Sequence, residues 1–159
     1  SHGLRLVGLK ALGSLRMEKG YRDYGHDIDN TDDPYGAGLG FAVDLDKPGG
    51  FIGRDALVAR HAAGLPTRRL TQILLTDPDP LMFHGEIVYR DGEAVGYIRA
   101  ASYGHTLGGA VGLAMISATQ VAQSWLDDGE WEVDIAGIRH PARASLRPLY
   151  DPSGERIHM

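Results

Sequence analysis

The second half of the chain carries the pattern that most narrows its fold, a series of short β-rich runs separated by turn residues. These runs cover residues 70–76, 86–91, 94–102, 110–117, 131–137 and 138–147. Short strands at such spacing are typical of a small antiparallel barrel or sandwich. Asp91-Gly92 is a strong hairpin signal, and Ala136-Gly137 fits a second tight turn between two runs. We therefore expect an antiparallel β domain in the second half of the chain.

The first half has a different pattern. Within residues 6–19, Leu9, Leu12 and Leu15 recur every three positions, which predicts a helix. Gly20 can take the left-handed conformation that closes a helix, so the residues after it are expected to leave as a loop.

Turn residues fill positions 30–40, and the alternation at 41–45 predicts a short strand. A second short helix is expected over residues 54–63, with Gly64 closing it. The composition changes near Leu65, which marks the expected boundary between a mixed α/β part and the β domain.

Composition excludes several classes of function. The net charge of -5 argues against a nucleic-acid partner, because such binding needs a basic face. The sequence has no run of eighteen apolar residues, so no segment is expected to span a membrane as a helix. The chain has no cysteine, so disulfides and thiolate chemistry are excluded, and a cytoplasmic location is consistent with this. The chain begins without methionine, and we expect it to be a piece of a longer polypeptide.

Four aspartates at positions 27, 29, 32 and 33 resemble a calcium loop. An EF-hand counted from Asp27 needs glycine at its sixth position and glutamate at its twelfth, where Asp32 and Gly38 stand. We expect these aspartates to cap turns through backbone amides instead.

Other sites fail on spacing. His84, His105 and His140 lie near different strands and match no zinc motif. The glycines at 36–40 start a dinucleotide pattern, but Phe41 stands where its third glycine is needed. No GxSxG motif is present. We therefore predict no metal ligand.

The stretch RMEKGYRDYGHDID at residues 16–29 is unusually rich in ionisable and aromatic side chains. An arginine fork holds a carboxylate, and a tyrosine ring lies against a flat ring, so Arg16 and Tyr24 suit a planar anionic ligand. In the alternative, Arg16 pairs with an acid such as Glu18 or Glu86, and Tyr24 packs on the core.

Several longer segments carry a family resemblance: SLRMEKGYRDYGHDID, DPYGAGLGFAVDLDKPGGFIGRDAL, VGYIRAASYGHTLGGAVGLAMIS and IRHPARASLRPLYDPSGERI. Together they resemble the aminomethyltransferase family of the glycine cleavage T protein, over about Leu4 to Ile157. They are most similar to the folate-binding region of dimethylglycine and sarcosine dehydrogenases and oxidases.

The resemblance implies an α+β fold. Residues 1–65 would be the C-terminal part of a mixed α/β folate-binding domain, residues 66–150 a small antiparallel β-barrel, and residues 151–159 a tail. The segment YGHTLG at 103–108 would be a tight turn in this barrel.

The resemblance also implies folate chemistry. Arg16 matches the arginine of the family's RLE segment and Tyr24 the tyrosine of its YGHD segment, so both are expected to bind tetrahydrofolate. Glu18 is expected to be structural. The family's catalytic aspartate and the FAD domain of the dehydrogenases lie outside this chain, so no catalytic residue is assigned.

Such a protein would oxidise an N-methyl amine and pass the one-carbon unit to tetrahydrofolate. This chain would then supply one wall of the folate cavity and would need N-terminal domains or a partner subunit. Two alternatives remain open: a folate-binding module without transfer chemistry, and a module that docks other subunits.

Overall fold

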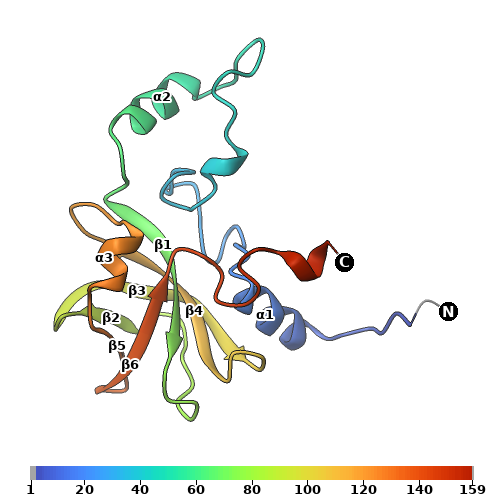
Figure 1. Cartoon of the computed structure of the whole chain (residues 1–159), viewed down its shortest axis with the longest axis vertical. Coiled ribbons are helices and arrows are strands. Elements are labelled where there is room, and N and C mark those ends of the chain that lie inside the picture. Colours follow the sequence, from blue (N-terminus) through green and yellow to red (C-terminus); the bar gives the residue numbers. More distant parts are fainter. Residues whose placement is uncertain (1–2, 159) are drawn as a thin grey trace.

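Six β-strands close into an antiparallel barrel in the computed structural model, which describes residues 3–158 (Figure 1). The strands are β1 (Arg68–Leu75), β2 (Ile87–Arg90), β3 (Glu93–Gly104), β4 (Gly109–Ser117), β5 (Trp131–Ile135) and β6 (Ile138–Ser145). Their order around the barrel is β1-β4-β3-β2-β5-β6, and β6 pairs with β1 to complete the ring. The strands predicted from the sequence are confirmed, and they form a barrel rather than a sandwich.

Two predicted hairpin turns are confirmed. Asp91 and Gly92 join β2 to β3 with φ of 52° and 82°, and Ala136 and Gly137 join β5 to β6 with φ of 52° and 85°. Positive φ at both central residues is the mark of the tight turn that matches the twist of paired strands. The β5–β6 turn sets the register of its whole hairpin, whereas in the β2–β3 hairpin a bulge shifts the pairing between Val88 and Tyr89.

The helices are α1 (Leu9–Glu18), α2 (Arg54–Ala62) and α3 (Gln123–Asp127), with short 3-10 turns η1 (Gly40–Ala42) and η2 (Glu155–Ile157). Gly20 closes α1 as predicted, with φ of 65°. Its N–H donates to the carbonyl of Met17 at 3.1 Å, and the N–H of Tyr21 donates to that of Arg16 at 2.9 Å. This pair of bonds is the Schellman motif, and it sends the chain sharply away from the helix axis.

The strand predicted at residues 41–45 is wrong. The chain instead makes η1, in which the N–H of Val43 donates to the carbonyl of Gly40 at 3.1 Å. A strand needs a partner edge, and every strand of the closed barrel is already paired on both sides. Phe41 consequently lies in solvent, with 86% of its surface exposed.

Strand β4 is buried on both faces. Ala110, Ala114 and Ile116 belong to the core inside the barrel. The alternate residues Val111, Leu113 and Met115 belong to a second core, which they share with Met17 of α1 and Ile28 of the following loop. This second core fixes α1 and its loop against the outer wall of the barrel.

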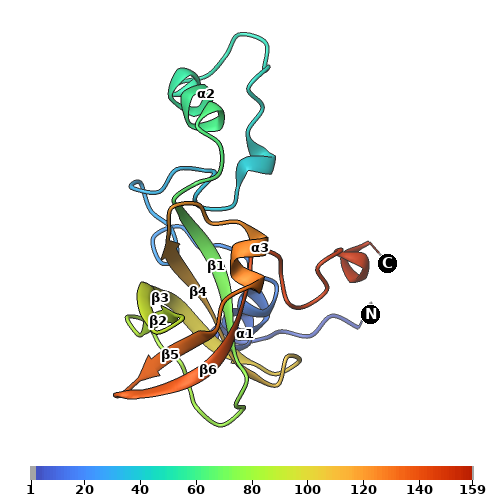
Figure 2. The same ribbon diagram turned by 60° about the vertical axis from the view of Figure 1, so that its left-hand side comes forward.

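Residues 41–64, with α2, project from one end of the barrel as an extended arm (Figures 1 and 2). No residue of α2 is buried. The leucine stripe of α1 also faces solvent, with Leu9, Leu12 and Leu15 exposed by 86%, 54% and 56%. Within residues 3–158 the helices are too short or too polar to cross a bilayer.

Candidate functional site

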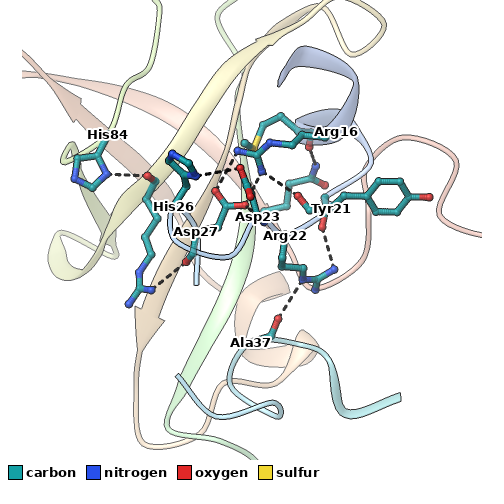
Figure 3. Close-up of polar contacts among 12 residues, drawn as sticks. Arg16, Tyr21, Arg22, Asp23, His26, Asp27, Ala37 and His84 are labelled. Carbon is teal, nitrogen blue, oxygen red and sulfur yellow. Dashed lines mark hydrogen bonds and ion pairs between the residues drawn. The ribbon is translucent and has the colours of Figure 1, made fainter. Parts of the chain in front are cut away.

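The loop after α1 is held by a buried ion pair (Figure 3). Arg16, in the last turn of α1, donates from Nη1 and Nη2 to the carboxylate of Asp27 at 2.5 and 3.3 Å. The Asp27 side chain is fully buried and also accepts the N–H of Asp23 at 2.8 Å. Arg16 therefore does pair with an acid, but that acid is Asp27 rather than Glu18 or Glu86.

A second arginine fixes the same loop from the barrel. Arg99 on β3 donates from Nη1 to the carbonyl of Asp27 at 3.0 Å and to the carboxylate of Asp32 at 2.6 Å. Burial lowers the pKa of Arg99, but the hydrogen bond and charge of Asp32 outweigh burial and raise the pKa overall. The loop is thus clamped between a helix and a strand, which makes it a rigid platform.

Tyr24 lies on this platform and points away from the core. It forms an isolated bridge with Ile28, while 70% of its surface remains exposed. The ring is therefore available to a ligand, whereas the Arg16 guanidinium is largely committed to Asp27. The two predicted site residues share one loop system but offer different groups.

Glu18 ties α1 to the turn between β3 and β4. Its buried carboxylate accepts the N–H groups of Thr106 at 2.6 Å and Leu107 at 3.0 Å. One turn earlier, the hydroxyl of Ser14 donates to the carbonyl of Tyr103 at 2.6 Å. A carboxylate that accepts two main-chain N–H groups orders the turn, and this geometry agrees with the structural interpretation of Glu18.

A cavity of about 470 Å³ lies between α1 and this turn. Glu18 and Ser14 line it from the helix, while Tyr103 and His105 line it from the barrel with ring centroids 5.2 Å apart. The volume is in the range of small-molecule sites, and the paired rings suit a flat ligand. Neither Arg16 nor Tyr24 lines this cavity.

Sequence reasoning treated residues 103–108 as a turn and missed these rings. The turn itself is confirmed, since the N–H of Gly108 donates to the carbonyl of Gly104 at 2.8 Å and Gly108 has φ of 78°. The signal for the site was the spacing of Tyr103 and His105, because residues two apart at a strand end lie on one face.

Asp29 and Asp33 cap turns of the loop as predicted, whereas Asp27 and Asp32 mainly pair with arginines. Asp29 accepts the N–H of Thr31 at 2.7 Å, and Asp33 accepts those of Tyr35 and Gly36 at 2.9 and 3.0 Å. Hydrogen bonds from the hydroxyl and amide of Thr31 lower the pKa of Asp29. Between residues 3 and 158, His, Asp and Glu form no group of three that could hold a metal.

The chain is similar to known proteins over nearly its whole length. Residues 68–151 match the family model for the glycine cleavage T-protein C-terminal barrel domain, and residues 1–47 match that for the GCVT N-terminal domain. The chain is 48% identical over 155 residues to 4-methylaminobutanoate oxidase (formaldehyde-forming) of Paenarthrobacter nicotinovorans, covering 98% of this chain and 18% of that protein. It is 35% identical to human mitochondrial sarcosine dehydrogenase, again over 98% of this chain and 17% of that protein.

A solved structure has the same fold. The glycine cleavage system aminomethyltransferase T from Bartonella henselae superposes with a TM-score of 0.71 at 24% identity, over 87% of this chain and 37% of that one. The chain thus spans less than a fifth of the two curated relatives and little more than a third of this transferase.

Proposed function

The chain belongs to the glycine cleavage T-protein (aminomethyltransferase) family, and we propose that it forms one wall of a tetrahydrofolate site in a protein that oxidises an N-methyl amine. The similarity to an oxidase and a dehydrogenase of methylated amines supports this class of substrate. In this proposal residues 1–65 belong to the folate-binding domain, residues 66–150 form the barrel, and residues 151–159 are a tail.

The cavity between α1 and the β3–β4 turn carries this proposal. The pterin of tetrahydrofolate has a flat pyrimidine ring and several N–H donors. Tyr103 and His105 offer ring faces for such a group, and Glu18 places a carboxylate acceptor in the same wall. The size of the cavity, about 470 Å³, fits one heterocycle with part of its substituent.

Arg16 and Tyr24 have different roles in this proposal. The exposed ring of Tyr24 borders the aromatic part of the folate. Arg16 acts mainly through Asp27, because that pair fixes the loop which carries Tyr24. Both residues therefore affect binding, Tyr24 by contact and Arg16 by positioning.

A folate titration tests the site. Tetrahydrofolate binding to the longest natural polypeptide that contains this chain would be measured by isothermal calorimetry. We expect Tyr103→Ala, which removes a ring contact, and Arg16→Ala, which releases the loop that carries Tyr24, each to weaken binding about tenfold or more, equivalent to about 1.4 kcal/mol. Asp23→Ala, which removes a neighbouring exposed charge, is the matched control. Equal, small effects of Arg16→Ala and Asp23→Ala would remove Arg16 from the site.

The chemistry of the whole protein is part of the same proposal. FAD, bound outside this chain, would oxidise the N-methyl group, and tetrahydrofolate would accept the released one-carbon unit. The residues described above would orient the folate and keep water out of the cavity, which favours transfer over release of formaldehyde.

The native mass of the polypeptide separates this function from its alternatives. An immunoblot of source cells with an antibody to this chain would give a band several times heavier than 17.2 kDa if the chain is part of such an oxidoreductase. A band near 17 kDa would favour a folate-binding or subunit-docking module, which acts without its own flavin domain.

A further inference from the structure

Two arginines that have no carboxylate partner among residues 3–158 lie side by side where the loop after α1 meets the start of β1. We propose that Arg22 and Arg69 form a binding site for a small oxyanion. This site is separate from the Arg16–Asp27 pair and from the cavity beside Glu18.

The hydrogen bonds of the two guanidinium groups leave donors unused. Arg22 donates from Nε to the carbonyl of Ala37 at 3.1 Å and from Nη1 to that of Gly20 at 2.9 Å. Arg69 donates from Nη1 to the carbonyl of Tyr35 at 2.9 Å, while its buried Nε has no partner. Within residues 3–158, Nη2 of either arginine has no acceptor. The two Nη2 groups are thus left for a ligand, whereas Nε of Arg69 is an unsatisfied donor inside the protein.

Gly38 brings the two side chains together. It has φ of 73°, and a Cβ at this position would lie 2.5 Å from Nη2 of Arg22 and 3.7 Å from Nη2 of Arg69. Because glycine has no Cβ, the Arg22 guanidinium can lie directly against the backbone of Gly38, close to the Arg69 guanidinium. Arg147 lines a small depression together with Arg22, although Arg69 does not line it.

The electrostatics of this pair are unfavourable without an anion. Burial and the charge of Arg69 lower the pKa of Arg22, and burial lowers the pKa of Arg69. Asp27 is the one acid that acts on Arg22, and its charge raises that pKa. However, the oxygens of Asp27 already accept Arg16 and the N–H of Asp23. A bound anion would neutralise two half-buried like charges and satisfy the unused donors.

The donor geometry indicates the ligand class. A guanidinium edge matches two oxygens of a phosphate or a carboxylate, and two such groups together can surround one oxyanion. The ligand is therefore a phosphate or carboxylate group, either free or part of a larger molecule. Inorganic phosphate and a dicarboxylate, used as separate probes, distinguish the phosphate class from the carboxylate class.

Direct binding can be followed with inorganic phosphate. We expect the ³¹P NMR line of millimolar phosphate to broaden in the presence of the chain at constant ionic strength, with chloride as the balancing anion. At a phosphate concentration of about ten times Kd, the unfolding midpoint should rise by about 3–5 °C. Glutarate forms a parallel arm, and a rise with glutarate alone would assign the site to carboxylates.

Variants assign the binding to these residues. Arg22→Gln and Arg69→Gln should each abolish the line broadening and the thermal shift. Arg54→Gln is the matched control, because Arg54 also donates to a carbonyl, that of Leu45, but on the distant arm. Gly38→Ala keeps both arginines and displaces the Arg22 guanidinium, so it should also abolish binding in a chain whose circular dichroism is unchanged. The proposal is overturned if neither probe binds the parent chain, or if Arg54→Gln reduces binding as much as the other two.

Discussion

Removal of the Asp27 carboxylate is the sharpest test of how this fold is held. Its side chain is fully buried and accepts two bonds from Arg16 and one from the N–H of Asp23. Loss of one partner from a buried pair costs about 3–5 kcal/mol, because the other charge stays behind unpaired. Arg16 keeps its bond to the carbonyl of Tyr21, and 20% of its side chain is exposed, so water recovers part of the loss. We therefore expect Asp27→Ala to lower the free energy of unfolding by about 2–4 kcal/mol.

Urea unfolding followed by circular dichroism measures this change. With a slope of about 2 kcal/mol per molar urea, the midpoint should fall by about 1–2 M. Asp23→Ala is the control, since Asp23 makes an exposed pair with His26 that is worth about 0–1 kcal/mol. The double variant with Arg16→Ala should be less destabilised than the two single effects together, by about 1–3 kcal/mol. If Asp27→Ala behaves like Asp23→Ala, the buried pair does not hold the loop and the reasoning fails.

Three further predictions concern the barrel. Ile98→Ala should lower the free energy of unfolding by about 2–5 kcal/mol in denaturant titrations, because this fully buried side chain belongs to the inner core. Gly96→Ala should lower it by about 1–3 kcal/mol, since its Cβ would collide with the carbonyl oxygen of Met115 on the paired strand; an unchanged midpoint would contradict that pairing. Burial raises the pKa of Glu86, so the folded state holds this proton more tightly than the unfolded state, and stability falls as pH rises through the folded pKa. Glu86→Gln keeps an acceptor for the N–H of Phe83 and should remove this fall, which unfolding at pH values above and below the ordinary glutamate pKa of about 4.3 would show.

The sequence indicated where the candidate site lies but not how its side chains pair. The stretch 16–29 was recognisable as unusual because so many ionisable groups stand together. The pairing within this stretch could not be predicted. Whether Arg16 pairs with Asp27 or with Glu18 depends on the direction in which the chain leaves α1. Gly20 provided the signal for a turn, but a turn signal does not state which carboxylate the turn brings back.

The paired arginines illustrate the same limit. Arg22 and Arg69 are 47 residues apart in the sequence and meet because one follows α1 while the other begins β1. The turn predicted from the glycines at 36–40 is present, but their spacing could not show that Gly38 admits a guanidinium. Contacts of this kind arise from packing of separate segments.

The sequence by itself determined the local structure: the strands of the barrel, the Asp91-Gly92 and Ala136-Gly137 turns, and the end of α1 at Gly20. These features depend on backbone preferences and on alternation over a few residues. Tertiary structure alone decided which faces are covered. Barrel closure buried both faces of β4 and left residues 41–45 without a partner edge, and docking through Met17 turned the leucine stripe of α1 to solvent. The physical reason is that burial depends on what packs across a face, and those partners lie far away in the chain.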